Sequence, residues 1–346
     1  MSKVLYYHLN SFPEISARDE YRLATSFGLH SPRFRHGFDN QLDLIENPLY
    51  ASEDVAKYKN KINFPANFTS TFEELTNRRA VELWDIGKPI RLWWSGGIDS
   101  TCALVSLLKT RRLDTRLTVY LSTNSVQENP RFYDLLVNKK VKLEWHSHKN
   151  YIYDNIELWN GQTINVNGNG GDELFLAISS TMSIEEFFKI KDSDWINVIK
   201  DKDSDMLNVI KKYIDISPYK PKTCWELLWW FARSIDDLST RYHSPRFLKD
   251  PSVYHLEHAF FYTDYFEKWA LSNPYAGHNG DYGTYKWPMK KYIYDYDKNE
   301  EYLNTKQKES SFPLIYKKQS RYLGISRGHY VLNKIVYEDG TYVRYK

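Results

Sequence analysis

The chain is poor in cysteine and lacks long apolar runs, and each absence excludes a class of protein. Only two of its 346 residues are cysteine, Cys102 and Cys224. A disulfide framework is therefore excluded, and a reducing cytoplasm is the expected location. No cysteine–histidine spacing suggests zinc. No stretch reaches about 18 apolar residues, and the N-terminal residues lack an apolar signal core, so we expect neither a secretory signal nor a membrane partner.

The chain also lacks an excess of charge of either sign. Its 47 basic and 44 acidic residues leave a formal net charge of +3. Nucleic-acid-binding domains usually carry a marked basic patch, so a nucleic acid partner stays open but is not indicated by charge. The hydrophobic content of 42% supports a substantial core, and the length allows one large or two ordinary domains.

Short apolar segments alternate with helical patterns in the middle of the chain. This alternation predicts an α/β fold, a parallel β-sheet with helices on both faces. The strands are expected at residues 90–94, 117–122, 141–146 and 163–166. Helices are expected from residue 70 or 71 to about 86, from 101 and over 130–138 and 152–159, with further helices over 180–250.

A glycine-rich turn joins the first of these strands to the next helix. It reads Ser95-Gly96-Gly97-Ile98-Asp99-Ser100-Thr101. Small residues before a helix let its first N–H groups approach an anion, and three hydroxyls add donors. A carboxylate at Asp99 would repel phosphate unless a cation lay between them, so the turn predicts Mg²⁺. The spacing is neither the G-x-x-x-x-G-K-[ST] loop nor a G-x-G-x-x-G dinucleotide turn.

A second glycine-rich turn follows the strand at 163–166. It again combines glycines, Gly170 and Gly171, with a carboxylate, Asp172. The carboxyl ends of parallel strands carry the ligand-binding loops of such sheets. We therefore expect the two turns to hold one Mg²⁺–pyrophosphate group between them.

Together the two turns resemble the synthetase domain of asparagine synthetase, a member of the ATP-pyrophosphatase (PP-loop) family with an SGGxDS motif. The family's second motif, G-E-G-x-D-E-L-F, stands here as Gly168-Asn169-Gly170-Gly171-Asp172-Glu173-Leu174-Phe175. The resemblance implies an adenine nucleotide alpha-hydrolase-like fold and an AMP-forming, ATP-dependent carbon–nitrogen ligase. The predicted ATP and pyrophosphate ligands are Ser95, Gly96, Gly97, Asp99, Ser100, Thr101, Gly170 and Gly171, and the predicted Mg²⁺ ligands are Asp99 and Asp172.

The implied reaction adenylates a substrate carboxylate or amide oxygen, releases pyrophosphate, and lets an amine or ammonia displace AMP. Lys306 lies in a segment that resembles the family's R-x-K-Q stretch, which implies that it neutralises charge on the transferring phosphates, with Lys308 as the alternative. Glu173 and Asp264 are the candidates for a general base toward the amine, although Glu173 also suits a helix start. Asp264 matches the last residue of the family's E-x-R-x-P-F-L-D segment.

Departures from the family pattern leave the second substrate open. Asn169 replaces the glutamate that acts near the second substrate in the family, and Ala259 and Phe261 replace the arginine and proline of the later segment. Residues 285–291 resemble the family's K-x-x-L-R-x-A. The acceptor is expected to be a small molecule or a peptide.

Three regions are expected along the chain. Residues 1–75 form an N-terminal extension of unassigned role. They are too few for the family's glutaminase domain and hold no cysteine. Glutamine hydrolysis in the same chain is therefore not expected, and the amine or ammonia would come free or from a partner protein.

Residues 76–325 are expected to form the synthetase-like domain with a helical C-terminal extension. Residues 326–346 alternate around Asp339-Gly340 and predict a terminal β-hairpin.

Two other functions remain open at this point. One is a different ATP-pyrophosphatase that acts on a nucleobase or tRNA. The other is a catalytically inactive module that binds the nucleotide without turning it over. Asn169 favours the inactive module, whereas Asp99, Ser100 and Asp172 oppose it.

Overall fold

The computed structural model forms two compact units, each described here by itself. The sheet unit comprises residues 64–175 and 240–309, and the second unit comprises residues 1–63, 176–239 and 310–346. The structure describes residues 4–6, 35–37, 68–111, 116–146, 158, 160–175, 184–202, 207, 211, 214–215, 219–231, 257–280 and 284–306. The domain boundaries expected at residues 75 and 325 stay predictions.

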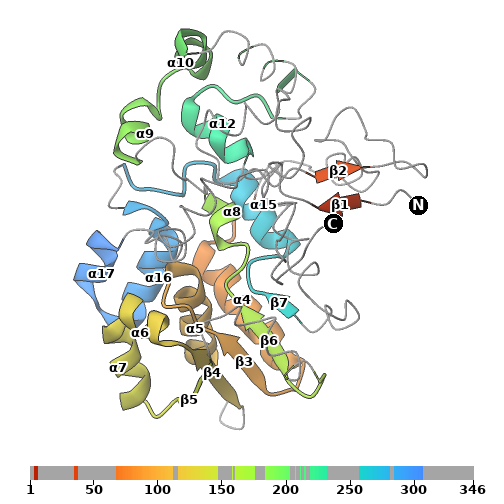
Figure 1. Ribbon diagram of the computed structural model, residues 1–346, viewed down its shortest axis with the longest axis vertical. Helices are drawn as coiled ribbons and strands as arrows, with labels where there is room; N and C mark the ends of the chain where they lie inside the picture. The colour runs from red at the N-terminus through yellow and green to blue at the C-terminus, as the bar shows by residue number, and fades with distance from the viewer. Residues whose placement is uncertain are drawn as a thin grey trace, which may run out of the picture. The chain divides into compact units, whose positions relative to one another are not determined.

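Five parallel strands form the sheet of the sheet unit (Figure 1). Their order is β5 (Lys142–Trp145), β4 (Leu117–Leu121), β3 (Ile90–Trp93), β6 (Ile164–Asn167) and β7 (Glu257–Ala259). In register, Ile90 of β3 lies opposite Leu117 on one side and Ile164 on the other. The predicted α/β class and parallel sheet are confirmed, and four strands lie where the sequence places them. The fifth, β7, was not expected.

The strand order reverses at β3. From β3 the chain runs outward through β4 to β5 and then returns to the other side of β3 as β6, with β7 beyond it. In open parallel sheets the crevice for a ligand opens at the carboxyl ends of the strands on either side of such a reversal. The loops that follow β3 and β6 therefore lie at the place where this Rossmann-like architecture binds ligands.

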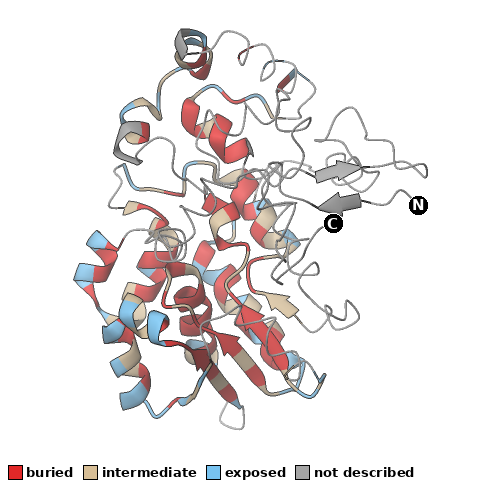
Figure 2. Cartoon of the chain, viewed as in Figure 1, coloured by how far each residue is buried: buried red, intermediate tan, exposed pale blue. Residues whose placement is uncertain are grey.

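Helix α5 (Ile98–Thr110) forms the centre of the core. Most of its residues are small or apolar, and the seven consecutive residues 101–107 are completely buried. Figure 2 shows this helix and the central strands as mostly buried. α5 packs against α4 (Phe72–Asp85) and α16 (Trp287–Asp297), so the loop at its N-terminus starts from a rigid base.

Helix α4 begins where the sequence predicts. The Thr71 hydroxyl accepts a hydrogen bond from the Glu74 amide at 3.2 Å, and the Thr71 amide donates to the Glu74 carboxylate at 2.8 Å. This reciprocal arrangement is a capping box, which supplies partners for backbone groups at the start of a helix. The helix ends at Asp85, before the Gly87-Lys88-Pro89 stretch.

An aromatic cluster joins three helices under the loop that follows β6. It connects α4, α8 (Gly171–Phe175) and α15 (Asp264–Ser272). Phe72 lies at its centre, with ring centroids 5.1 Å from Trp269 and 5.7 Å from Phe175. Buried aromatic pairs of this kind stabilise the fold beyond what the burial of their apolar surface contributes. The cluster holds the short helix α8, and with it the preceding glycines, against the rest of the unit.

Shorter helices complete the described part of the sheet unit. α7 (Pro130–Asn138) matches its prediction, with Pro130 in the first turn and the Asn129 side chain accepting from the Phe132 amide at 3.2 Å. α6 (Thr123–Glu128) and α17 (Glu300–Thr305) were not predicted as separate helices. The helix expected over 152–159 lies almost wholly outside the described residues.

Short strands and several helices lie among the described residues of the second unit. β1 (Val4–Tyr6) pairs antiparallel with β2 (Arg35–Gly37). The helices α9 (Ile184–Ile190), α10 (Trp195–Lys202) and α12 (Cys224–Phe231) agree with the helical prediction for 180–250. The hairpin predicted at 326–346 lies outside the described residues. Within the described part of the chain, no helix is long and apolar enough to span a membrane.

Candidate functional site

The first loop, residues 95–101, links β3 to α5 and is internally bonded. The hydroxyl oxygens of Ser95 and Ser100 lie 2.9 Å apart, and the Ser95 amide donates to the Ser100 hydroxyl at 3.1 Å. Gly97 caps α5 without a side chain, so the first amides of that helix stay uncovered by a capping group. Such amides bind anions, because they have no partner within the helix.

One predicted ligand of this loop turns inward. Thr101 is completely buried, and its hydroxyl accepts from the Trp94 indole at 2.9 Å and lies 3.4 Å from the Gly96 carbonyl oxygen. A buried indole N–H needs an acceptor, and Thr101 supplies it. In this structure Thr101 therefore fixes the shape of the loop.

The second loop, residues 168–172, lies directly against the first. A Cβ atom on Gly168 would stand 2.6 Å from the Ser100 amide nitrogen, and one on Gly171 would stand 2.5 Å from the Asp99 carboxyl carbon. Neither distance is compatible with a side chain. The glycines of the second motif thus let its backbone touch the first loop, as the sequence predicts for two strand-end loops.

The two predicted metal ligands converge on one lysine that the sequence analysis did not single out. The Lys286 ammonium forms ion pairs with Asp99 and with Asp172, the latter at 2.6 Å. The Tyr285 hydroxyl donates to the same Asp172 oxygen at 3.5 Å. Burial lowers the pKa of Lys286, but the carboxylates of Asp172 and Asp99 raise it, and the net result is a pKa well above the ordinary value. The lysine therefore carries its charge at neutral pH.

The backbone of Lys286 is held in an unusual conformation. Its φ of 54° is left-handed, it precedes the first residue of α16, and it is only 2% exposed. Its amide donates to the Gly277 carbonyl at 2.7 Å, and its own carbonyl accepts from the Lys290 amide at 3.1 Å. A residue other than glycine rarely adopts this region unless its surroundings fix it, so the backbone of Lys286 is held in place beside the two loops.

Lys306 is linked to the first loop by Glu128, which contacts both. Its ammonium contacts the Glu128 carboxylate at 3.6 Å and the Glu128 carbonyl at 3.3 Å. The same glutamate would lie 3.3 Å from a Cβ on Gly97. Lys290, also fully buried, donates to the Lys306 carbonyl at 3.0 Å. The predicted lysine is thus adjacent to the loop, while Lys286 is the one between the aspartates.

The two predicted bases occupy different environments. Glu173 is 6% exposed within α8, next to Asp172 in the chain. Asp264 is exposed in the first turn of α15, where a carboxylate favours the helix N-terminus. The structure brings Glu173 to the loops but gives Asp264 the surroundings of an ordinary helix-starting residue.

A third carboxylate, that of Glu257 on the unpredicted strand β7, also contacts the second motif. The Oε1 atom of Glu257 accepts hydrogen bonds from the side-chain Nδ2 groups of Asn167 at 2.6 Å and Asn169 at 3.4 Å. Asn169 is the position where the resembling family has glutamate. A carboxylate from a neighbouring strand thus lies beside Asn169. The sequence could have pointed to Glu257, because this residue matches the first glutamate of the E-x-R-x-P-F-L-D segment.

The residues after β7 cover the second loop. The Phe260 amide donates to the Asn167 carbonyl at 2.9 Å, and the Phe261 amide donates to the Asn169 carbonyl at 3.3 Å. A Cβ on Gly170 would stand 2.6 Å from the Tyr262 ring. This segment therefore fixes the backbone that presents Asp172.

The donor set suits a magnesium ion. The carboxylates of Asp99 and Asp172 both contact one cation, the Lys286 ammonium. The position of that ammonium shows where a metal ion could contact both carboxylates. Proteins often hold Mg²⁺ through one or two carboxylates, while phosphates and water supply the other ligands. Within the described residues, no group of three or more histidine, cysteine, aspartate or glutamate side chains could hold a metal ion alone.

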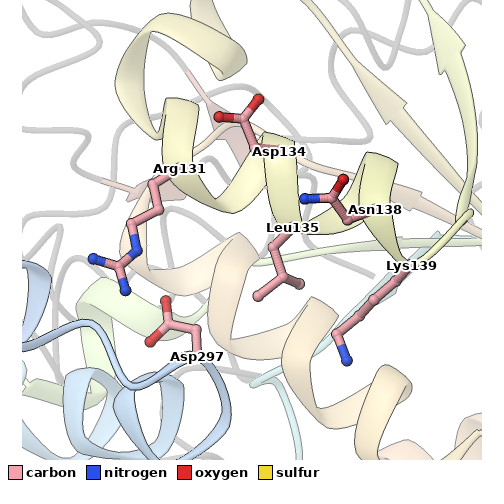
Figure 3. A pocket seen from close by; sticks show the side chains of 6 residues that line it. All are labelled: Arg131, Asp134, Leu135, Asn138, Lys139 and Asp297. Carbon is pink, nitrogen blue, oxygen red and sulfur yellow. The ribbon is translucent and has the colours of Figure 1, made fainter.

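A separate pocket lies between α7 and the C-terminal end of α16 (Figure 3). Its volume is about 370 Å³, and it is lined by Arg131, Asp134, Leu135, Asn138, Lys139 and Asp297. Burial raises the pKa of Asp297, against the opposing effects of the Asn299 amide and the Arg131 charge. None of the motif residues lines this pocket, so it does not contribute to the loop site.

Comparison with models of known protein families finds no match, and comparison with curated proteins finds none either. The functional interpretation therefore depends on the motifs and on the geometry of the two loops.

Proposed function

We propose that this chain is an ATP-dependent, AMP-forming carbon–nitrogen ligase of the asparagine synthetase type. It would adenylate a carboxylate or amide oxygen of a small molecule or peptide, and then join the activated carbon to an amine or ammonia. The observation that carries the proposal is the contact between the two loops at the strand-order reversal, with both aspartates aimed at one cation position. Cys102 and Cys224 are both buried and form no disulfide, which agrees with the cytoplasmic location we propose.

The first loop would bind the pyrophosphate part of ATP. The uncovered amides at the start of α5 and the Ser95 and Ser100 hydroxyls supply donors for its oxygens. Asp99 and Asp172 would hold Mg²⁺, which neutralises phosphate charge when it is bound. Lys286 and Lys306 add two positive charges near the same oxygens. Their role is to stabilise the negative charge that develops on the leaving pyrophosphate.

Two bonds form and two break in the proposed reaction. The acceptor oxygen attacks the α-phosphorus, and the bond to the bridging oxygen of pyrophosphate breaks. The amine then attacks the activated carbon, and AMP leaves with the acceptor oxygen that had attacked the phosphorus. The attacking amine must lose a proton, and Glu257, the carboxylate beside Asn169, is the residue we assign to receive it.

The products of ATP turnover test the proposal directly. Purified protein would be incubated with ATP, Mg²⁺ and pooled candidate acids and amines. We expect AMP and pyrophosphate, and we expect Asp99→Asn to abolish both while Asp134→Asn, an exposed control on α7, leaves them unchanged. ADP with inorganic phosphate would refute the mechanism. ATP bound without turnover, with every pool tried, would favour the inactive nucleotide-binding module.

Glu257→Gln should separate the two half-reactions. The variant keeps the shape and the hydrogen-bonding positions but cannot accept the proton of the amine. General-base catalysis is worth about 10²-fold or more, so we expect the rate of amide formation to fall by about that factor. Exchange of labelled pyrophosphate into ATP, which reports adenylation alone, should change by less than about twofold.

Glu144→Gln is the matched control for this variant, because Glu144 also lies on a strand of the sheet, in β5 at the opposite edge. It should leave both half-reactions intact. Equal losses of exchange and amide formation in Glu257→Gln would mean that Glu257 only supports the second loop.

A further inference from the structure

Lys286 occupies the position that a metal ion would take in the proposed reaction. Its ammonium contacts Asp99 and lies 2.6 Å from the Asp172 oxygen. Magnesium binds carboxylate oxygens at about 2.1 Å, so the ion and the ammonium cannot share this point. The two cations must therefore exclude one another unless the geometry changes.

Charge also favours exclusion. With the ammonium in place, the two carboxylates keep one net negative charge, and without it they keep two. A divalent ion that approached the intact trio would meet a positive charge within contact distance, in surroundings where the lysine side chain is only 3% exposed. Two like charges at contact distance in such partly desolvated surroundings repel each other strongly. The free protein should thus bind divalent cations poorly.

We propose that Lys286 is a positioning residue that holds the two carboxylates together while no nucleotide is bound. The proposal rests on the proposed function for the assignment of Asp99 and Asp172 as metal ligands. A divalent cation then enters only together with phosphate oxygens, whose negative charge compensates for both cations. The protein would accept the metal–nucleotide complex as one ligand instead of binding the metal first.

The left-handed backbone of Lys286 supports this role. Its φ of 54° is fixed by the bond to the Gly277 carbonyl at 2.7 Å and by the first turn of α16. A conformation that most residues avoid is kept here at a point where it aims one ammonium at two loops. The side chain has four rotatable bonds, so its ammonium can shift toward a phosphate without movement of this backbone.

Binding of Mn²⁺, a spectroscopic substitute for Mg²⁺, tests the proposal without any substrate. Electron paramagnetic resonance would count free Mn²⁺ during a titration of the full chain. We expect weak binding to the unaltered protein and at least about tenfold tighter binding to Lys286→Met. Lys286→Arg keeps the charge and should stay weak. Lys290→Met, which removes another buried ammonium from α16, one that donates to the Lys306 carbonyl, should also stay weak.

Two results would overturn the proposal. One is stoichiometric Mn²⁺ binding by the unaltered, nucleotide-free protein at micromolar concentration, a measurement that needs no variant to fold. The other is a folded Lys286→Met variant that binds Mn²⁺ no more tightly than the unaltered protein. A rise in melting temperature on adding Mg²⁺, confined to Lys286→Met and absent from Lys286→Met/Asp99→Asn, would support it independently.

These outcomes are distinguishable from failure of the proposed function. AMP and pyrophosphate formation without the predicted change in Mn²⁺ affinity would leave the ligase standing and remove the role given to Lys286. The predicted change in affinity without any AMP would leave the role of Lys286 standing and remove the ligase.

Discussion

Gly168→Ala should reduce AMP formation at least about 100-fold, because it drives the two loops apart. The added methyl group would stand 2.6 Å from the Ser100 amide nitrogen and 2.9 Å from the Asp99 carbonyl carbon, both backbone atoms. A flexible side chain could move away, but these atoms belong to the first turn of a fully packed helix. A misplacement of about 1 Å in a catalytic arrangement commonly costs about 10²-fold in rate.

The same variant should lower the free energy of unfolding by up to about 3 kcal/mol, the upper end for inserting one methyl into a packed site. Urea unfolding monitored by circular dichroism would measure it. Gly161→Ala is the control for an added methyl group that meets no neighbouring atom. Gly161 has a φ of +76° and nothing within 4 Å of the added methyl, so this variant should lose only the cost of backbone strain, about 1–2 kcal/mol. Wild-type activity in Gly168→Ala would show that the loops do not have to touch.

Lys286→Met should lower the free energy of unfolding by about 3 kcal/mol. Removing one partner from a buried ion pair leaves an uncompensated charge and costs about 3–5 kcal/mol. We expect the lower end, because the Asp99 and Asp172 side chains remain 22% and 30% exposed and water can partly solvate them. Lys291→Met, which breaks an exposed pair with Asp295 on the same helix, should cost less than about 0.5 kcal/mol.

A triple variant tests the electrostatic explanation. Replacing Lys286 with methionine and both Asp99 and Asp172 with asparagine removes all three charges. Exchange of a whole buried ionic group for neutral residues is often close to neutral in stability. We therefore expect the triple variant to regain most of the stability lost in Lys286→Met, as measured in metal-free buffer. If it is no more stable than the single variant, the loss comes from packing and not from charge.

The two loops were predictable because their signals are local. Each consists of an apolar strand, a few small residues and a helix, all within about a dozen positions, and such patterns report strand–turn–helix units directly. The expectation that both loops lie at one edge required only that parallel strands end at the same edge. The contacts at Gly168 and Gly171 show the two loops side by side, and the Mg²⁺–pyrophosphate group expected between them stays a prediction.

The cation between the loops was not predictable in the same way. Lys286 lies 187 positions after Asp99, and its contact depends on how α16 packs on α5. Its segment was noticed only as similar to K-x-x-L-R-x-A.

Strand β7 was missed because Glu257-His258-Ala259 has neither an apolar run nor clear alternation, and Glu257 was missed with it. Thr101 was read as a phosphate donor because the need of Trp94 for an acceptor becomes visible only in three dimensions.

The separation of 187 positions between Asp99 and Lys286 sets an order of events during synthesis of the chain. Because synthesis runs from the N-terminus, both glycine-rich loops, with Asp99 and Asp172, are made before Lys286, the lysine that pairs with them. Until the last third of the sheet unit has been synthesised, the two loops lack the charge of Lys286, and β7 is not there to border β6. The complete site can therefore form only after residue 286 has been synthesised, and a fragment that stops at Phe175 would hold both aspartates without this lysine.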